Sequence, residues 1–320
     1  MKILIDSLHN LTQIECNFAL LAKEGIPWHS IPDLDVFDQF CQRFGSKILS
    51  LDVRCDSQQL SRIKTFENLK DIKISPYFYL WDLYGFPLNN LEKVAFNQLN
   101  DDFKTFVTQF KRLKCLAIWY LVDANDVNIL FNELLKLKHL IDLDIEVYAD
   151  DSRGLINKRF EEISYNSNLK SINCGYFGVD SDFLEIDVIL DPFIRFKHLE
   201  RLDLCIEFSI DTNDETIKLF SLKSFDGLKG LTHLNLDFGP NFIFENTILT
   251  GIDIILPNLR YFKFKNKIFC SQWTADILSR FSRLESIKLD VINQSIRPII
   301  EDRIRKNCKK VRQIDLSIEY

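Results

Sequence analysis

The sequence predicts an α/β solenoid, a fold in which similar units of one short strand and one helical segment stack along the chain. Three observations support this prediction. A leucine-containing pattern recurs about twelve times along the 320 residues, and amphipathic helical patterns lie between several of its copies. The composition, with 46% hydrophobic and 27% charged residues, is that of a globular chain able to bury a core. We expect one solenoid domain over residues 1–320.

The recurring pattern begins with an apolar residue, has leucine three residues later, and ends with two aliphatic residues that flank a polar one. Phe66, Leu69, Ile72 and Ile74 form the first clean copy. The clean copies cover residues 66–74, 110–118, 137–145, 196–204, 228–236, 256–264 and 281–289, and weaker copies cover 11–16, 48–53, 91–96, 169–174 and 311–316. Most neighbouring leading leucines are roughly 21 to 32 residues apart, a spacing typical of solenoid repeats.

The spacing of the aliphatic residues predicts strands, because side chains alternate between the two faces of an extended backbone. The leading leucine, such as Leu140 before Leu143 and Ile145, is expected to pack inward from the loop before the strand. One unit is too small to bury these side chains, so stacked units share a continuous core. Because a helix is about 10 Å wide and paired strands are about 4.8 Å apart, we expect a curved horseshoe with strands on the concave face and helices on the convex face.

Helices are predicted between copies of the repeat. Apolar residues at steps of three and four indicate helices at residues 101–110, 126–137, 274–281 and 296–308. Asp126 and Thr274 open two of these segments, and aspartate and threonine are residue types that cap helix N-termini. We therefore predict both residues as N-caps.

The repeats match an L-x-x-L-x-L core, and the chain resembles the leucine-rich-repeat family over nearly its whole length. The asparagine or cysteine that usually follows the strand in this family does not recur, so we expect the loops to satisfy their backbone groups in another way. These irregular repeats look most like the repeat region of intracellular F-box leucine-rich-repeat proteins, although no F-box is visible in this chain. The resemblance implies a non-catalytic protein-recognition module. Its specific role would be that of a substrate receptor of a ubiquitin ligase, with a ubiquitin-ligase adaptor as a second partner.

Several functional classes are disfavoured. No nucleophile elbow, zinc-protease motif or phosphate-binding loop occurs, so we predict no enzyme, no cofactor and no metal site. His139 and His198 precede leading leucines and His233 lies two residues after one, and we interpret all three as exposed repeat positions. The net charge of -6 argues against a nucleic-acid partner, whose phosphates need a basic face. No apolar stretch is long enough for a membrane span, and eight dispersed cysteines indicate reduced thiols in the cytoplasm or nucleus.

The candidate binding surface is the open face of the strands. Its central column, the polar residue between the two strand aliphatics, is acidic in the middle of the chain and basic near Lys263 and Lys288. Trp119, next to Ala117, is the predicted aromatic anchor, because large aromatic residues are enriched among binding hot spots. We predict that the acidic part binds a basic segment of a partner protein. The predicted partner-binding residues are Trp119, Asp142, Asp144, Glu146, Asp203, Asn235, Asp237, Tyr261, Lys263 and Lys288.

Two alternatives to this surface stay open. Charged residues on an exposed sheet face also keep a protein soluble without binding any partner. A cytosolic scaffold or small-GTPase-type regulator would instead use the helical outer face, and substitutions on that face would then remove binding.

Overall fold

A computed structural model of the chain describes residues 15–17, 39, 41–53, 66–74, 88–99, 103–148, 153–165, 168–179, 191–208, 216–218, 225–239, 242–244 and 246–317. The chain forms two compact units. Unit 1 contains Met1–Leu121 and Asn128–Asp144, and unit 2 contains Val122–Val127 and Ile145–Tyr320. The single solenoid domain over residues 1–320 stays a prediction.

The strands of unit 1 follow one another in a parallel sheet, each paired with the next repeat's strand. They are β1 (Glu15–Asn17), β2 (Ser50–Val53), β3 (Asp71–Ile74), β4 (Lys93–Gln98) and β5 (Cys115–Leu121). The next strand, β6 (Asp142–Val147), begins in unit 1 and ends in unit 2.

The strands of unit 2 continue the same parallel pattern. In pairing order they are β7 (Ser171–Val179), β8 (Arg201–Phe208), β10 (His233–Asp237), β12 (Tyr261–Ile268), β13 (Ser286–Val291) and β14 (Gln313–Ser317). Two short strands, β9 (Thr216–Lys218) and β11 (Phe242–Phe244), pair with each other, and β11 also pairs with the end of β12.

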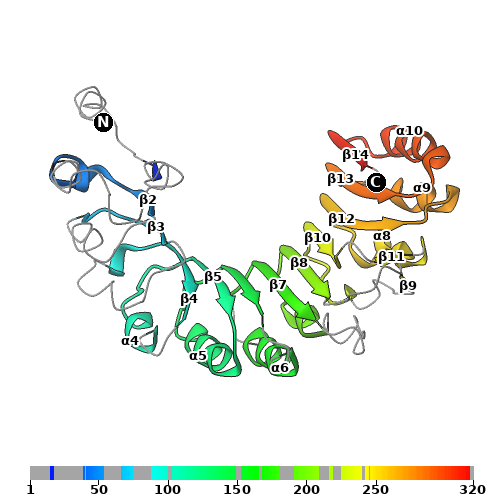
Figure 1. The fold of residues 1–320 in the computed structure, drawn as a ribbon. Helices are drawn as coiled ribbons and strands as arrows, with labels where there is room; N and C mark the ends of the chain where they lie inside the picture. Colours follow the sequence, from blue (N-terminus) through cyan, green and yellow to red (C-terminus); the bar gives the residue numbers. More distant parts are fainter. Residues whose placement is uncertain are drawn as a thin grey trace, which may run out of the picture. The chain divides into compact units, whose positions relative to one another are not determined.

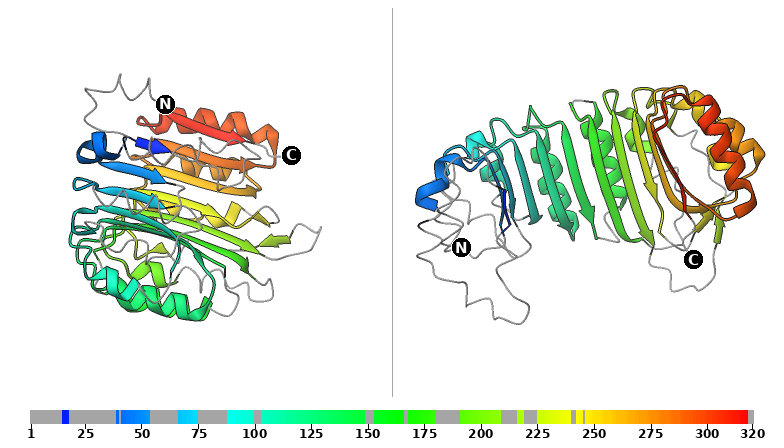
Figure 2. Two further views of the ribbon diagram at one scale, coloured as in Figure 1. Left: turned by 60° about the vertical axis from the view of Figure 1, so that its left-hand side comes forward. Right: turned by 90° about the horizontal axis from the view of Figure 1, so that it is seen from above.

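The helical segments lie on one face of the strands in unit 2, and no helix of the described residues covers the other face (Figures 1 and 2). The α-helices of the chain are α4 (Phe103–Val107), α5 (Ala124–Leu134), α6 (Arg153–Ser164), α8 (Ile252–Ile255), α9 (Gln272–Leu278) and α10 (Arg297–Asn307). The 3-10 helices are η2 (Gly45–Lys47), η4 (Leu88–Asn90), η7 (Asp191–Arg195), η9 (Asn246–Leu249) and η10 (Gln294–Ile296).

The core consists of the apolar positions of the repeats. In the copy at 196–204, Phe196, Leu199, Leu202 and Leu204 are all buried, with at most 2% of their surface exposed. The same four positions are buried in every clean copy from 66–74 to 281–289 for which the structure describes the side chain. Burial of one such leucine stabilises the fold by about 1.5–3 kcal/mol. Because a single repeat cannot bury these side chains alone, this stabilisation comes mainly from contact between neighbouring repeats. The predicted α/β solenoid is confirmed, and the number of repeats stays a prediction.

A row of backbone carbonyl groups fixes the register of the repeats. The residue after the leading leucine has a backbone carbonyl oxygen that accepts hydrogen bonds from two backbone N–H groups of the next repeat. In unit 2, Glu200 accepts from the amides of Thr232 and His233 at 2.8 and 3.0 Å. In unit 1, Lys114 accepts from Ile141 and Asp142 at 2.9 and 3.0 Å. The same double acceptance recurs at Leu49, Lys70, Glu92, Lys170, Thr232, Arg260 and Glu285, and it aligns equivalent residues of successive strands.

The predicted helix N-caps are wrong. Helix α5 begins at Ala124, and Asp123 Oδ1 accepts the amide of Asp126 at 2.8 Å, so Asp126 lies inside the first turn. In α9 the N-cap is Ser271, and Thr274 completes a capping box three residues later. The apolar pattern locates the buried face of a helix, but the first turn is polar and lies outside that pattern.

The expectation that the loops satisfy their backbone groups without such asparagines is wrong at two places. Asn266 Oδ1 accepts the amide of Phe238 at 2.8 Å, and its Nδ2 donates to Gly239 O at 2.5 Å. Gly239 has a left-handed backbone with φ of 78°, which favours glycine at this turn. Asn293 likewise accepts from the amide of Cys270 and donates to its carbonyl oxygen. A search at fixed spacing misses Asn266 because it lies where β12 changes register with β13, between Phe264 and Lys267.

Candidate protein-binding surface

The open face of unit 2 carries polar residues in register. The predicted central column is confirmed on six of its strands, where the neighbours in order are Asn173, Asp203, Asn235, Lys263, Lys288 and Asp315. A second column runs along the strand starts and consists of Ser171, Arg201, His233, Tyr261, Ser286 and Gln313. In unit 1, Ala95 and Ala117 are register neighbours in the corresponding central column.

Most predicted partner-binding residues meet on this open face of unit 2. Those residues are Glu146, Asp203, Asn235, Asp237, Tyr261, Lys263 and Lys288. The others, Trp119, Asp142 and Asp144, belong to unit 1, where all three side chains are half-buried. Their role in partner binding stays a prediction.

Several charges on the open face are paired within the protein. Arg201 Nε lies 2.5 Å from Asp203 Oδ2, Lys265 Nζ lies 2.6 Å from Asp237 Oδ2, and Lys288 Nζ lies 3.2 Å from Asp315 Oδ2. A partner that binds here therefore meets a mixed surface, and the acidic character at Asp203 and Asp237 is weaker than the sequence suggests. The Arg201–Asp203 pair was detectable, because residues two apart on a strand share a face.

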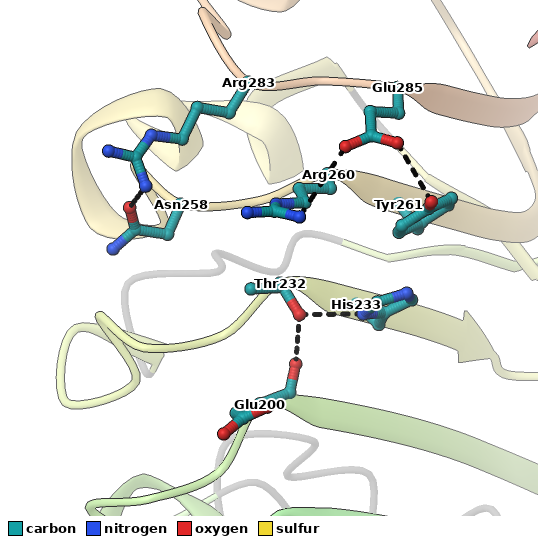
Figure 3. A network of polar contacts seen from close by, with 8 residues as sticks. All are labelled: Glu200, Thr232, His233, Asn258, Arg260, Tyr261, Arg283 and Glu285. Carbon is teal, nitrogen blue, oxygen red and sulfur yellow. Dashed lines mark hydrogen bonds and ion pairs between the residues drawn. The ribbon is translucent and has the colours of Figure 1, made fainter. Parts of the chain in front are cut away.

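A stacked pair of rings, missed by the sequence analysis, lies on this face. The His233 and Tyr261 rings are 4.1 Å apart between centroids at an angle of 12° (Figure 3). The Tyr261 hydroxyl donates to Glu285 Oε2 at 3.0 Å, and Arg260 lies 3.8 Å from the same carboxylate. This hydrogen bond raises the pKa of Tyr261 and keeps its hydroxyl protonated. His233 is thus an ordered part of the surface and not merely a tolerated exposed residue.

The hydrogen bonds of His233 define its tautomer. The Thr232 hydroxyl donates to Glu200 O at 2.9 Å, and its oxygen lies 2.8 Å from His233 Nδ1 (Figure 3). A hydroxyl has one proton, so it can only accept from the imidazole, and Nδ1 carries the proton. Partial burial is the largest cause that lowers the pKa of His233, and the positive charge of Arg201 lowers it further. The neutral ring therefore keeps an acceptor lone pair on Nε2.

The described residues contain no group of three or more histidine, cysteine, aspartate or glutamate residues able to hold a metal ion. None of the helices in the same ranges is long and apolar enough to cross a membrane. Burial raises the pKa of the Cys205 thiol to about 11 and that of Cys270 to about 12, so both thiols are protonated and poor nucleophiles at neutral pH.

Comparisons with known proteins give similarities of fold only. No protein-family model matches the chain, and no curated protein matches it. Among solved structures it is similar to a TDR receptor, at 12% identity and a TM-score of 0.41, over 87% of this chain and 44% of that one. It is similar to a chain of the yeast Rad7 and Elc1 complex, at 13% identity and a TM-score of 0.46, over 79% and 74% of the two chains. Internalin C2 from Listeria monocytogenes matches at 14% identity and a TM-score of 0.29, over 73% and 83%.

The chain thus spans less than half the length of the TDR receptor chain that it matches. None of these similarities assigns a function. The ordered parallel strands and buried leucine positions described above identify the fold as leucine-rich-repeat-like.

Proposed function

We propose that this chain is a non-catalytic protein-recognition module that binds a partner protein through the open sheet face of unit 2. The observation that carries this proposal is the alignment of polar and aromatic side chains in columns on a face that no described helix covers. Such a face offers hydrogen-bonding groups, charges and ring surfaces at fixed spacing, which suits an extended segment of another protein.

The charges on this face favour a partner segment with a basic stretch at one end and an acidic stretch at the other. Carboxylates are in the majority at Glu146 and along β8 and β10, although Asp203 and Asp237 are ion-paired. Lys263 and the ion-paired Lys265 and Lys288 lie on β12 and β13. A basic stretch of the partner would lie over the first group, and an acidic stretch would lie over the second. Complementary charges of this kind accelerate association and orient the partner.

The specific role we propose is that of a substrate receptor of a ubiquitin ligase in the cytoplasm or nucleus. Its support is the resemblance of the irregular repeats to those of F-box leucine-rich-repeat proteins. In this role the open face would hold the substrate, and a ubiquitin-ligase adaptor would bind elsewhere on the protein.

The second candidate is a cytosolic scaffold or small-GTPase-type regulator that binds through its helices. The observation that favours it is a set of exposed apolar side chains on three helices of unit 2. They are Ile254 on α8, Trp273 on α9 and Ile299 on α10, and Ile254 is 73% exposed. Exposed apolar side chains mark protein-binding surfaces where they form a contiguous patch.

Site-specific photo-crosslinking separates the two candidates. A benzoylphenylalanine replaces Lys263 on the open face or Trp273 on the helical face, in the full chain expressed in its native cells. We expect Lys263 to give discrete protein adducts, whereas a control at Asp226, in an exposed turn, gives none. Adducts from Trp273 alone would overturn the open-face proposal in favour of the scaffold.

Mass spectrometry of the adducts and of co-purified proteins tests the ubiquitin-ligase role. We expect a cullin-type ligase adaptor among the co-purified proteins and a different protein attached at Lys263. Discrete adducts at Lys263 without any ligase component would overturn the receptor role and leave protein recognition standing.

A further inference from the structure

A second pair of stacked rings lies on the open face of unit 2. The rings of Tyr148, just after β6, and Phe177, on β7, have centroids 4.7 Å apart at an angle of 12°. Tyr148 is 39% exposed, and its hydroxyl donates to Glu146 Oε2 at 3.1 Å. This hydrogen bond holds a carboxylate beside the edge of an exposed aromatic surface.

Gly175 makes room for this pair. A Cβ atom at this position would lie 2.7 Å from Phe177 Cε2 and 3.5 Å from Glu146 Cγ, so any other residue would displace the ring. The backbone of Gly175 does not explain the glycine, because among the described glycines a positive φ occurs at Gly239 and Gly251. The glycine is therefore required by the position of the Phe177 ring.

The surroundings of the ring pair have an excess of negative charge. Cys205 is the register neighbour of Gly175, and the charged groups that act on its thiol are Asp237, Lys265, Glu207 and Glu146. Lys265 is already paired with Asp237. Within the described residues, neither Glu146 nor Glu207 forms an ion pair, in contrast to the paired carboxylates at Asp203 and Asp315. The region is thus complementary to a cation.

We propose that Tyr148, Phe177 and Glu146 form a subsite for an arginine side chain of the partner protein. A guanidinium group is planar, stacks on aromatic rings and donates two parallel hydrogen bonds to a carboxylate. The ring pair supplies the stacking surface, and Glu146, fixed by Tyr148, supplies the acceptor. Glu207 adds attraction at longer range. This inference rests on the proposed function and names one residue type within the basic segment of the partner.

The probe for this subsite is a fluorescein-labelled hexa-arginine peptide, with both ends blocked, added to the purified full chain at low salt. Fluorescence anisotropy measures its affinity beside that of hexa-lysine and of hexa-citrulline, which has the shape of hexa-arginine without the charge. We expect hexa-arginine to bind several-fold more tightly than hexa-lysine, and hexa-citrulline not to bind. A hexa-lysine affinity equal to that of hexa-arginine would overturn the subsite.

Variants test whether the ring pair is responsible. Phe177→Leu and Gly175→Ala change no charge, and we expect each to weaken hexa-arginine binding about fivefold or more, as for loss of one cation–aromatic contact. Glu146→Gln should weaken it as well. Phe269→Leu, at an exposed phenylalanine elsewhere, and Glu67→Gln, at an exposed glutamate of unit 1, are the matched controls and should leave the affinity unchanged.

Circular dichroism and thermal melting confirm that each variant is folded. Should Gly175→Ala lower the melting temperature, Phe177→Leu, which removes only a half-buried ring, still decides the question. Unchanged affinity in Phe177→Leu would overturn the arginine subsite. If the native protein gives adducts at Lys263 in that case, the proposed function stands, whereas adducts from Trp273 alone would overturn both.

Discussion

At the scale of single residues, His233 provides a pH-dependent prediction. The groups that act on its imidazole are Arg201, Asp203, Arg260 and Glu285, and partial burial is the largest cause of its lowered pKa. The folded protein therefore binds this proton less readily than the unfolded chain, whose histidine has a pKa near 6.5. Stability from this residue is fully present above pH 6.5 and is lost as the pH falls through the lowered pKa.

We expect the urea midpoint of the native protein to fall more between about pH 7.5 and pH 5.5 than that of His233→Gln, which cannot titrate. Nitrogen-15 NMR of the histidine should show a proton on Nδ1 at neutral pH. Thr232→Val should remove this tautomer preference. Equal pH dependence in both proteins, or a proton on Nε2, would contradict the assignment.

The sequence could predict that His233 lies on the open face, but it could not predict which residues His233 contacts. It precedes the inward-facing Leu234, and the alternation of a strand then puts its side chain on the opposite face. Its ring partner Tyr261 comes from the next repeat, and the ring orientation depends on the Thr232 hydroxyl. The same reason explains why the Tyr148–Phe177 pair was missed, because it depends on the space above Gly175.

At the scale of elements, the buried amide of Asn266 joins strand β12 to the turn that follows β10. Replacement by alanine leaves the amide of Phe238 and the carbonyl of Gly239 without their partner. We expect Asn266→Ala to lower the free energy of unfolding by about 1–3 kcal/mol, as measured by urea denaturation. Asn258, which is less buried and donates to Lys229 O at 2.7 Å, is the control, and its alanine variant should lose less than about 1 kcal/mol. Equal losses in the two variants would argue against a special role for the buried amide.

The strands of the repeats and their buried leucines were predictable, whereas the short strands β9 and β11, the helix starts and the side-chain bridges to loops were not. A strand in this fold repeats one local pattern, so several imperfect copies reinforce each other. The residues that cap helices or bridge to loops occur at irregular spacings, because each one fits the geometry of a particular loop. They are Asp123, Ser271, Asn266 and Asn293.

At the scale of the whole molecule, the single solenoid domain remains to be tested. If stacked repeats share one core, the two units should unfold together, because neighbouring repeats stabilise one another. Leu116→Ala in unit 1 and Leu202→Ala in unit 2 both remove fully buried side chains. We expect each to lower the free energy of unfolding by about 2–5 kcal/mol within one cooperative transition. Two transitions, each moved by only one variant, would show separate domains.

The charge pattern of the open face was only partly predictable. Composition and strand alternation place Asp203, Asp237 and Lys263 on one surface, as the registers confirm for Asp203 and Lys263. The neutralisation of Asp237 by Lys265 depends on how two side chains from different repeats extend toward each other. Such pairs are a property of neighbouring repeats, and a reading of one repeat at a time cannot reveal them.

Because the hydrogen bonds that align neighbouring repeats use backbone carbonyl groups, the alignment depends little on which side chains precede the strands. Residues as different as Lys114, Glu200, Thr232 and Arg260 all offer the same main-chain oxygen to the next repeat. During evolution, mutations at these positions can therefore alter what the protein selects while the assembly of its repeats is preserved. Engineers could exploit the same property by exchanging the residues at these positions to create new binding specificities on an unchanged scaffold.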